Sequence, residues 1–173
     1  TQIWGAEKTA WTSFHTHPKQ GDTTLTLSSE PIGWKAGDRL VVAATDINDP
    51  ASDEVVIIES IQDKEIVITH ALTKDHTALR QDLEVHVANL SRNIEFSSES
   101  AELMKRGHVM FMHNLDVNVN NARFYKLGRT DKTIPLDDYT WAGMGEFPPV
   151  KLEGDNIRGR YSVHFHRGGT GST

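Results

Sequence analysis

Two histidines near the end of the sequence, His164 and His166, have the spacing expected of a shared site. Because residues two apart on a β-strand point to the same face, both imidazoles would lie opposite Val163 and Phe165. Neutral imidazoles bind metal ions, and an imidazole pair can also supply an acid and a base. The spacing therefore predicts two catalytic residues. The alternative is a pair of exposed histidines on a strand.

A polar segment at residues 45–53 contains three carboxylates, Asp46, Asp49 and Asp53. Carboxylates this close together can bind Ca²⁺, or they can act as acid and base in glycoside cleavage. Their spacing is not that of an EF-hand loop. We expect Ca²⁺ to be the cofactor if this segment binds one, and Asp46 is also a candidate catalytic residue. The alternative is a solvated acidic loop.

Basic residues concentrate in the second half of the chain. The whole chain has a formal net charge of −6. Residues 1–90 carry 7 basic and 14 acidic side chains, whereas residues 91–173 carry 11 and 10. A guanidinium group can bind the carboxylate of a uronic acid through two hydrogen bonds. Arg92, Arg129 and Arg160 are therefore candidate ligands for an acidic sugar, with ordinary surface arginines as the alternative. The acidic balance argues against a nucleic-acid partner, which usually requires a strongly basic face.

Residues 130–158 are rich in proline and glycine, and they predict a long surface loop at the rim of a site. Two aromatic residues in this loop, Tyr139 and Trp141, are candidates for stacking on sugar rings. The other tryptophans accompany turns and strand starts, and we expect them to be packing anchors: Trp4, Trp11 and Trp34.

Short apolar and alternating runs predict that the chain is mostly β-strand. Residues 39–44 are apolar without alternation, which is typical of a strand buried on both faces. A short turn between residues 54–59 and 65–69 predicts a hairpin, and helix-favouring composition is confined to residues 98–106. The further predicted strands are residues 22–28, 83–90, 93–97, 108–112, 117–121 and 160–165.

The composition is that of a soluble globular protein. The chain has 173 residues, of which 37% are hydrophobic and 24% charged, so it can bury a sizeable core. It contains no cysteine, which excludes disulfides and thiolate metal sites. No apolar stretch approaches the roughly 20 residues that a membrane-spanning helix needs, so we expect no transmembrane segment.

After about residue 85 the predicted strands recur without paired hairpin turns. Short strands at this density are typical of solenoid coils, which bury their inner faces only by stacking on neighbouring coils. A β-sandwich would give a similar number of strands, so both architectures remain open at this point.

Several stretches of the sequence, in this order, resemble a known family. The chain is similar to the G8 domain and the β-helix that follows it in the family of cell-surface hyaluronidase, cell-migration-inducing hyaluronidase and polyductin-like proteins. It differs in lacking cysteine, and the relatives are much longer. The stretches are residues 4–12 (WGAEKTAWT), 33–46 (GWKAGDRLVVAATD), 84–94 (EVHVANLSRNI) and 159–166 (GRYSVHFH), with 107–111 (GHVMF) and 127–129 (LGR) in support.

The resemblance implies an all-β fold, a right-handed parallel β-helix with an N-terminal G8-type region. Residues 1–95 would cap the solenoid and residues 96–173 would form its first coils, as one continuous structural domain. It also implies an extracellular, secreted or cell-surface protein that binds or cleaves an acidic polysaccharide such as hyaluronan, as a hydrolase or a lyase. The alternatives are a non-catalytic carbohydrate-binding or adhesion module, and an N-terminal fragment of a larger β-helix protein.

Overall fold

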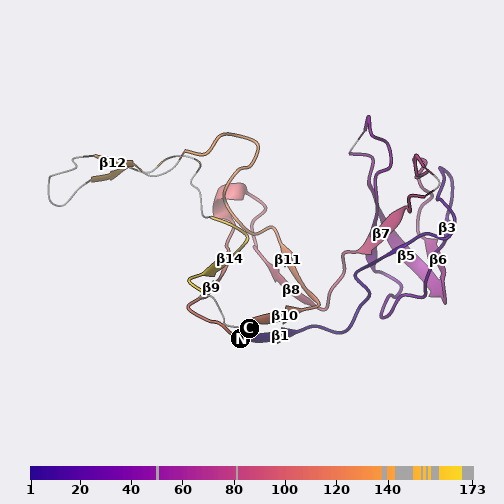
Figure 1. Cartoon of the computed structure of the whole chain (residues 1–173), viewed down its shortest axis with the longest axis horizontal. Coiled ribbons are helices and arrows are strands. Elements are labelled where there is room, and N and C mark those ends of the chain that lie inside the picture. Colours follow the sequence, from indigo (N-terminus) through magenta and orange to yellow (C-terminus); the bar gives the residue numbers. More distant parts are fainter. Residues whose placement is uncertain are drawn as a thin grey trace. The chain divides into compact units, whose positions relative to one another are not determined.

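The structure of the chain is a computed structural model (Figure 1). It describes residues 1–49, 51–80, 82–137, 140–142, 150–152, 154, 156 and 160–168. The fold is all-β, as expected, and within these residues the one helix is a single 3₁₀ turn, η1 (Leu103–Lys105). The predicted helical segment is therefore mostly irregular. No helix in the described part is long and apolar enough to cross a membrane.

The chain divides into two compact units. Residues 5–93 form one unit, here called the sheet unit. Residues 1–4 and 94–173 form the other, here called the strand-pair unit. The division lies close to the boundary expected at residue 95. The first four residues nevertheless belong with the C-terminal part of the chain, which the sequence did not indicate.

The sheet unit contains one six-stranded antiparallel sheet with strand order β2-β7-β4-β5-β6-β3. The sheet curls so that its edge strands meet: Phe14 bridges Leu27, and the Ser28 amide donates to the Ser13 carbonyl oxygen at 2.9 Å. The strands are β2 (Trp11–Ser13), β3 (Thr24–Thr26), β4 (Arg39–Val42), β5 (Glu54–Gln62), β6 (Glu65–Ile68) and β7 (His86–Asn89). The predicted hairpin is confirmed as β5 and β6.

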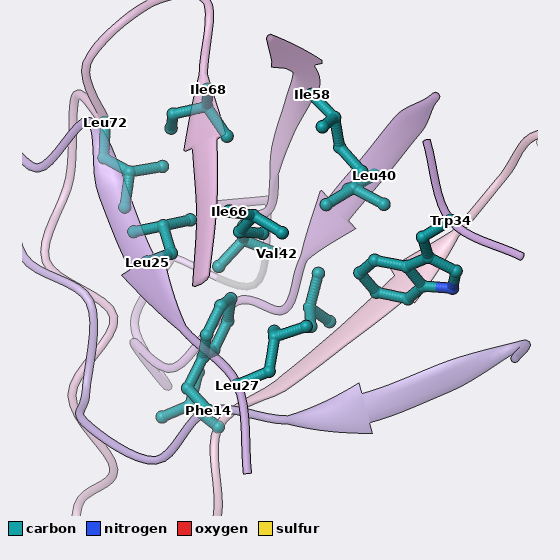
Figure 2. Close-up of a cluster of buried hydrophobic side chains, with 12 residues drawn as sticks. Phe14, Leu25, Leu27, Trp34, Leu40, Val42, Ile58, Ile66, Ile68 and Leu72 are labelled. Carbon is teal, nitrogen blue, oxygen red and sulfur yellow. The ribbon is translucent and has the colours of Figure 1, made fainter. Parts of the chain in front are cut away.

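The inner face of this sheet carries the largest apolar core of the described residues. Alternate residues of each strand point inward, as Ile66 and Ile68 do on β6. Figure 2 shows these side chains gathered from several strands, with Phe14 and Trp34 among them. The cluster comprises Phe14, Leu25, Leu27, Trp34, Leu40, Val42, Ile58, Ile66, Ile68, Leu72, Val85 and Val87.

Two expectations about this unit are wrong. Strand β4 is not buried on both faces: Leu40 and Val42 are buried, but Arg39 is exposed, because only one face of an antiparallel layer packs on the core. Of the three tryptophans expected to be packing anchors, only Trp34 is one, at 6% exposed; Trp11 is 61% exposed, and Trp4, in the strand-pair unit, is 64% exposed.

Three stretches that carry the family resemblance meet at one buried carboxylate, Asp38. Its Oδ2 accepts hydrogen bonds from the Lys8 ammonium group, the Lys35 amide at 3.1 Å and the Asn89 side chain at 2.9 Å. A buried carboxylate requires such partners, since an unpaired one is very costly. Close by, Gly33 has a φ of +72°, and a Cβ there would lie 2.5 Å from the Glu7 carbonyl oxygen. These motif residues therefore hold the sheet unit together.

The strand-pair unit is built from parallel pairs whose two strands lie far apart in the sequence. Strand β1 (Gln2–Trp4) pairs with β10 (Asn118–Asn120), β8 (Ile94–Ser97) with β11 (Ala122–Tyr125), and β9 (Val109–Met112) with β14 (Val163–His166). Figure 1 shows β9 beside β14, and β8 beside β11. Like residues stack across the pairs: the rings of Phe96 and Phe124 lie 5.2 Å apart, and those of Phe111 and Phe165 lie 5.1 Å apart.

The corners of this unit follow a common pattern. The residue directly after each of β9, β10, β11 and β14 has a φ near +50°, the left-handed conformation that side chains rarely adopt. These residues are His113, Asn121, Lys126 and Arg167. Equivalent corners also stack, because the His113 amide donates to the His166 carbonyl oxygen at 3.0 Å. Successive turns of the chain thus repeat one local geometry.

The predicted loop at residues 130–158 contains secondary structure of its own. Strands β12 (Thr140–Ala142) and β13 (Val150–Leu152) form a two-stranded antiparallel pair within it. Asn156, near the end of the segment in the sequence, is buried against the residues at its start. Its side chain exchanges hydrogen bonds with the backbone of Asp131, both at 2.8 Å. The segment is therefore tied down close to where it leaves the parallel pairs.

Candidate functional site

A concavity of about 480 Å³ in the strand-pair unit carries three cationic side chains, Arg106, Lys132 and Arg160. We call it the cationic pocket. None of its lining residues in the described part is acidic, so its local field favours an anion. Its lining comprises Leu103, Arg106, Leu127, Gly128, Thr130, Lys132, Arg160, Tyr161, Ser162 and Val163.

Backbone contacts between distant segments form the floor of this pocket. The Gly128 amide donates to the Gly107 carbonyl oxygen at 2.8 Å, and the Arg129 amide donates to the Arg160 carbonyl oxygen at 2.9 Å. Gly128 has a φ of +86°, and a Cβ there would lie 2.9 Å from the Ser162 nitrogen. Only glycine fits this close approach. The two ends of the 130–158 segment are brought together here.

The cations of the pocket differ in how they are held. Arg106 donates from Nε and Nη2 to the Ala101 carbonyl oxygen, at 3.1 and 2.8 Å, which fixes its guanidinium group. Within the described part of the chain, neither Lys132 nor Arg160 forms an ion pair. Arg129 does not line the pocket, but its Nε is buried without a hydrogen-bond partner. The positive charge of the pocket is thus left uncompensated by the described residues.

A second hollow nearby, of about 670 Å³, lacks this bias. Its lining includes Glu95 and Glu99 as well as Lys105 and His108, so its charges are mixed. Size alone therefore does not identify the better anion site, and the charge of the lining favours the cationic pocket.

The two histidines of the sequence motif lie together on β14, with ring centroids 5.4 Å apart. The Tyr161 ring lies 5.7 Å from that of His164, and the His113 ring lies 6.3 Å from that of His166. Tyr161 also lines the cationic pocket. A row of four rings therefore runs from the pocket along β14.

His164 carries an unusual nitrogen. Its Nδ1 is buried and has no hydrogen-bond partner. A buried polar atom without a partner costs about 1–3 kcal/mol and is typical of a strained or functional group. No hydrogen bond at this nitrogen fixes the tautomer of the ring.

The acidic segment of the sequence lies in the sheet unit, whereas the histidines lie in the strand-pair unit. Asp46 accepts a hydrogen bond from the Asn48 amide at 2.8 Å, and Asp49 pairs with Lys74 at 3.1 Å. Asp53 is exposed. The described residues include no group of three or more histidine, aspartate or glutamate side chains placed to hold an ion. Calcium binding here stays a prediction.

The remaining candidates are spread over the chain. Arg92 donates from Nη1 to the carbonyl oxygens of Asn89 and Ser91, at 2.9 and 2.7 Å, and so fixes its own loop in the sheet unit. Trp141 pairs with Lys151 through the backbone of β12. Tyr139 lies outside the described residues. Among the predicted arginines, only Arg160 lines the cationic pocket.

Three charged or aromatic residues of the pocket were not predicted: Arg106, Lys132 and Tyr161. Lys132 lies at the start of the 130–158 segment and Tyr161 follows its end, so the expectation that this loop borders a site could have pointed to them. Arg106 gave no such signal, because it directly follows η1, far from the 130–158 segment in the sequence.

Comparison with known proteins gives three similar curated proteins, all from Dictyostelium discoideum and all described as G8 domain-containing. They are 28%, 26% and 24% identical to this chain over 92%, 92% and 90% of its length. This chain is similar to proteins that contain a G8 domain. It spans only 12%, 10% and 9% of their respective lengths.

Other comparisons add little to the G8 relationship. No model of a known protein family matches the chain. One similar solved structure, the tailspike gp61 of Pseudomonas phage phi297, is 13% identical and covers 67% of this chain and 16% of its own. Its TM-score is 0.37, too low to define the fold. The G8 relationship therefore rests on the sequence, whose motif residues surround Asp38 in the sheet unit.

Proposed function

We propose that this G8 relative is an extracellular module that binds an acidic polysaccharide, such as hyaluronan, in the cationic pocket. The observation that carries the proposal is the lining of that pocket, where Arg106, Lys132 and Arg160 gather without an acidic residue in the described lining. A uronate carboxylate is planar and anionic, and guanidinium groups bind it with directed hydrogen bonds.

The wall of the pocket also suits a sugar. Tyr161 is 44% exposed, so its ring is available to stack on a pyranose. Ser162 lies in the same lining; its hydroxyl group donates to the Leu127 carbonyl oxygen at 2.7 Å, and its oxygen can accept a hydrogen bond from a sugar hydroxyl. A neutral polysaccharide would gain from these contacts but would leave the three cations unpaired.

We further propose that the strand-pair unit is the start of a right-handed parallel β-helix. In-register parallel pairs, stacked phenylalanines and repeated left-handed corners all support this architecture. The outer face of a solenoid is a continuous surface, which suits a polymer that extends beyond one pocket.

The test is binding of the whole chain to hyaluronan and to a neutral polysaccharide, measured by calorimetry at low and raised salt. We expect binding to hyaluronan only, weakening as salt rises. Replacing Arg160 by Ala should weaken binding to hyaluronan at least tenfold, because the hydrogen bonds between the guanidinium group and the uronate carboxylate are lost. A tenfold change corresponds to about 1.4 kcal/mol. The matched control is Lys19→Ala, an exposed lysine of the sheet unit, which should change nothing. Equal binding of both polymers, or an unchanged Arg160 variant, would contradict the proposal.

We also propose that the acidic segment at residues 45–53 binds Ca²⁺, and a separate thermal melt tests this. If Asp46, Asp49 and Asp53 bind Ca²⁺, a chelator should lower the thermal stability of the sheet unit, and added Ca²⁺ should restore it. An unchanged melting temperature would remove calcium from the proposal without affecting the pocket.

A further inference from the structure

One face of the β9–β14 pair carries two thioether side chains beside two imidazoles. Met110 and Met112 lie on β9, and the parallel register pairs them with His164 and His166 of β14. Residues two apart on a strand point to the same side of the sheet, and residues paired in register also share a side. All four side chains therefore leave the pair on one face.

This face is the open side of the pair. On β9, Phe111 is 8% exposed and faces the other way, towards its stacking partner Phe165. Met110 and Met112 are 39% and 54% exposed. Methionine usually fills irregular gaps in cores, where its flexible side chain is an advantage. Packing within the described part of the unit thus leaves much of these two side chains unused.

The spacing of the four residues suits a single ion. Paired strands lie about 4.8 Å apart, and residues two apart on a strand are separated by about 6.6 Å. The imidazole centroids of His164 and His166 are 5.4 Å apart. With metal–nitrogen bonds of about 2.0 Å, two imidazoles that share one ion have centroids roughly 5–6 Å apart. The two rings therefore lie at a separation that one ion can bridge.

His164 offers a nitrogen without a hydrogen-bond partner. Its Nδ1 is buried and makes no hydrogen bond. A neutral imidazole that carries its proton on Nε2 has a free lone pair on Nδ1, and this lone pair can bind a metal ion. A bound ion would therefore give this buried nitrogen the partner that the protein itself does not supply.

We propose that this face is a binding site for Cu(I), formed by Met110, Met112, His164 and His166. Thioether sulfur is a soft donor and favours Cu(I), and imidazole also binds copper. Zinc sites use thiolate, imidazole and carboxylate donors, of which this face offers only the two imidazoles. No group of three or more such donors is placed to hold an ion among the described residues. The thioethers therefore decide which metal the face accepts.

This inference goes beyond the proposed function and does not depend on it. The four residues are absent from the described lining of the cationic pocket. A copper site on β9 and β14 would also link two strands whose sequence positions are more than 50 residues apart. Binding of the ion to the folded chain should therefore raise the stability of the strand-pair unit.

The test is titration of the whole chain with Cu(I), kept reduced by ascorbate, in competition with a coloured Cu(I) chelator. Replacing Met110 and Met112 together by Leu keeps two apolar side chains of similar size but removes both sulfur atoms. Affinity should fall at least tenfold, because even indirect support of a metal ligand is typically worth about 10–100-fold. The matched control is Met104→Leu, another exposed methionine of the same unit, which should change nothing.

The histidines have their own variant and control. His164→Gln should also weaken Cu(I) binding at least tenfold, whereas His15→Gln combined with His17→Gln should not. His15 and His17 have the same spacing as the proposed pair but lie in the sheet unit. Thermal melts without copper show that each variant is folded. X-ray absorption of the loaded chain should show sulfur and nitrogen bound to copper, and the sulfur signal should disappear in the double methionine variant.

Four outcomes would overturn the inference. They are no binding of Cu(I) by the folded chain, equal affinity of the wild type and the double methionine variant, copper without a sulfur neighbour, and Zn²⁺ bound as tightly as Cu(I). None of them bears on the polysaccharide, whose binding calorimetry with hyaluronan tests separately.

Discussion

The two units of the chain bury their apolar side chains in different ways. The sheet unit closes a curled sheet around a cluster of twelve buried residues (Figure 2). In the described part of the strand-pair unit, Phe111 is the only buried apolar side chain, at 8% exposed, and its stacking partner Phe165 is 60% exposed. One unit completes its own core, whereas the other holds its strands through ladders and ring stacks.

This difference bears on where function can lie. The residues of the resemblance that surround Asp38 stabilise the closed unit, and the cationic pocket belongs to the unit with the thinner core. A strand of such a pair is stabilised mainly by the strand it pairs with. The shape of the pocket therefore depends mainly on backbone hydrogen bonds between segments. Predictions that separate the two units therefore also test this account of the site.

The largest expected effect is in the sheet unit. Ile66→Ala should lower the free energy of unfolding by about 2–5 kcal/mol, because Ile66 is fully buried and its loss leaves a cavity. Phe165→Ala, in the strand-pair unit, should cost less than about 1 kcal/mol despite removing a larger group. Denaturant unfolding of both variants makes the measurement. A cost for Phe165→Ala equal to that for Ile66→Ala would contradict the comparison.

The second effect is a pH dependence confined to the sheet unit. Although burial raises the pKa of Glu54, hydrogen bonds from Thr73, His76 and Lys74 lower it to about 2, from an ordinary 4.5. A lowered folded-state pKa stabilises the fold above the unfolded value. That stability is then lost as the pH falls from about 4.5 towards 2. The loss should approach about 3 kcal/mol.

Glu54→Gln should remove this dependence, and it should already destabilise the protein at pH 7. His76 is fully buried and bonded to both Glu54 and the Ala43 carbonyl oxygen, so the variant leaves a buried ring poorly paired. Urea unfolding at pH 7 and pH 3 makes the measurement, with the exposed Glu59→Gln as control. If wild type and Glu54→Gln lose equal stability between the two pH values, the Glu54 carboxylate is not the source of the pH dependence.

The smallest effect concerns the corners of the strand-pair unit. Arg167 has a φ of +49° and follows β14, so Arg167→Gly should relieve strain and stabilise the protein by about 1 kcal/mol. Glu99→Gly, at a residue without positive φ, should instead be neutral or slightly destabilising. Thermal melts of the two variants decide this, and equal shifts would mean that the corner stores no strain.

Most of the strands were predictable because their apolar residues alternate locally, but β1, β2, β11, β12 and β13 were not predicted. The hairpin of β5 and β6 needed only its turn and two adjacent runs, and η1 occupies part of the segment with helix-favouring composition. The exposure of Trp11 was not predictable in this way, since it depends on which face of β2 meets the core. The alternation of burial in β4 was missed for the same reason.

The candidate site was harder to predict because it depends on contacts between distant segments. Arg160 and Lys132 share a pocket only because β14 pairs with β9 and because Gly128 packs against Ser162. Local spacing correctly suggested that His164 and His166 lie together, but it could not supply Tyr161 as the residue between them and the pocket.

The strand pairing shows that the sheet unit is inserted in the sequence between two strands of the strand-pair unit. Trp4 pairs with Asn120, and Ile94 pairs with Ala122. Their partners are separated in the sequence by Asn121 alone, whereas residues 5–93 lie between Trp4 and Ile94. The Ala6 amide donates to the Asn93 side chain at 2.7 Å, which holds the ends of the intervening piece together. Residues 5–93 therefore have the topology of an insertion between two strands whose partners are separated by one residue.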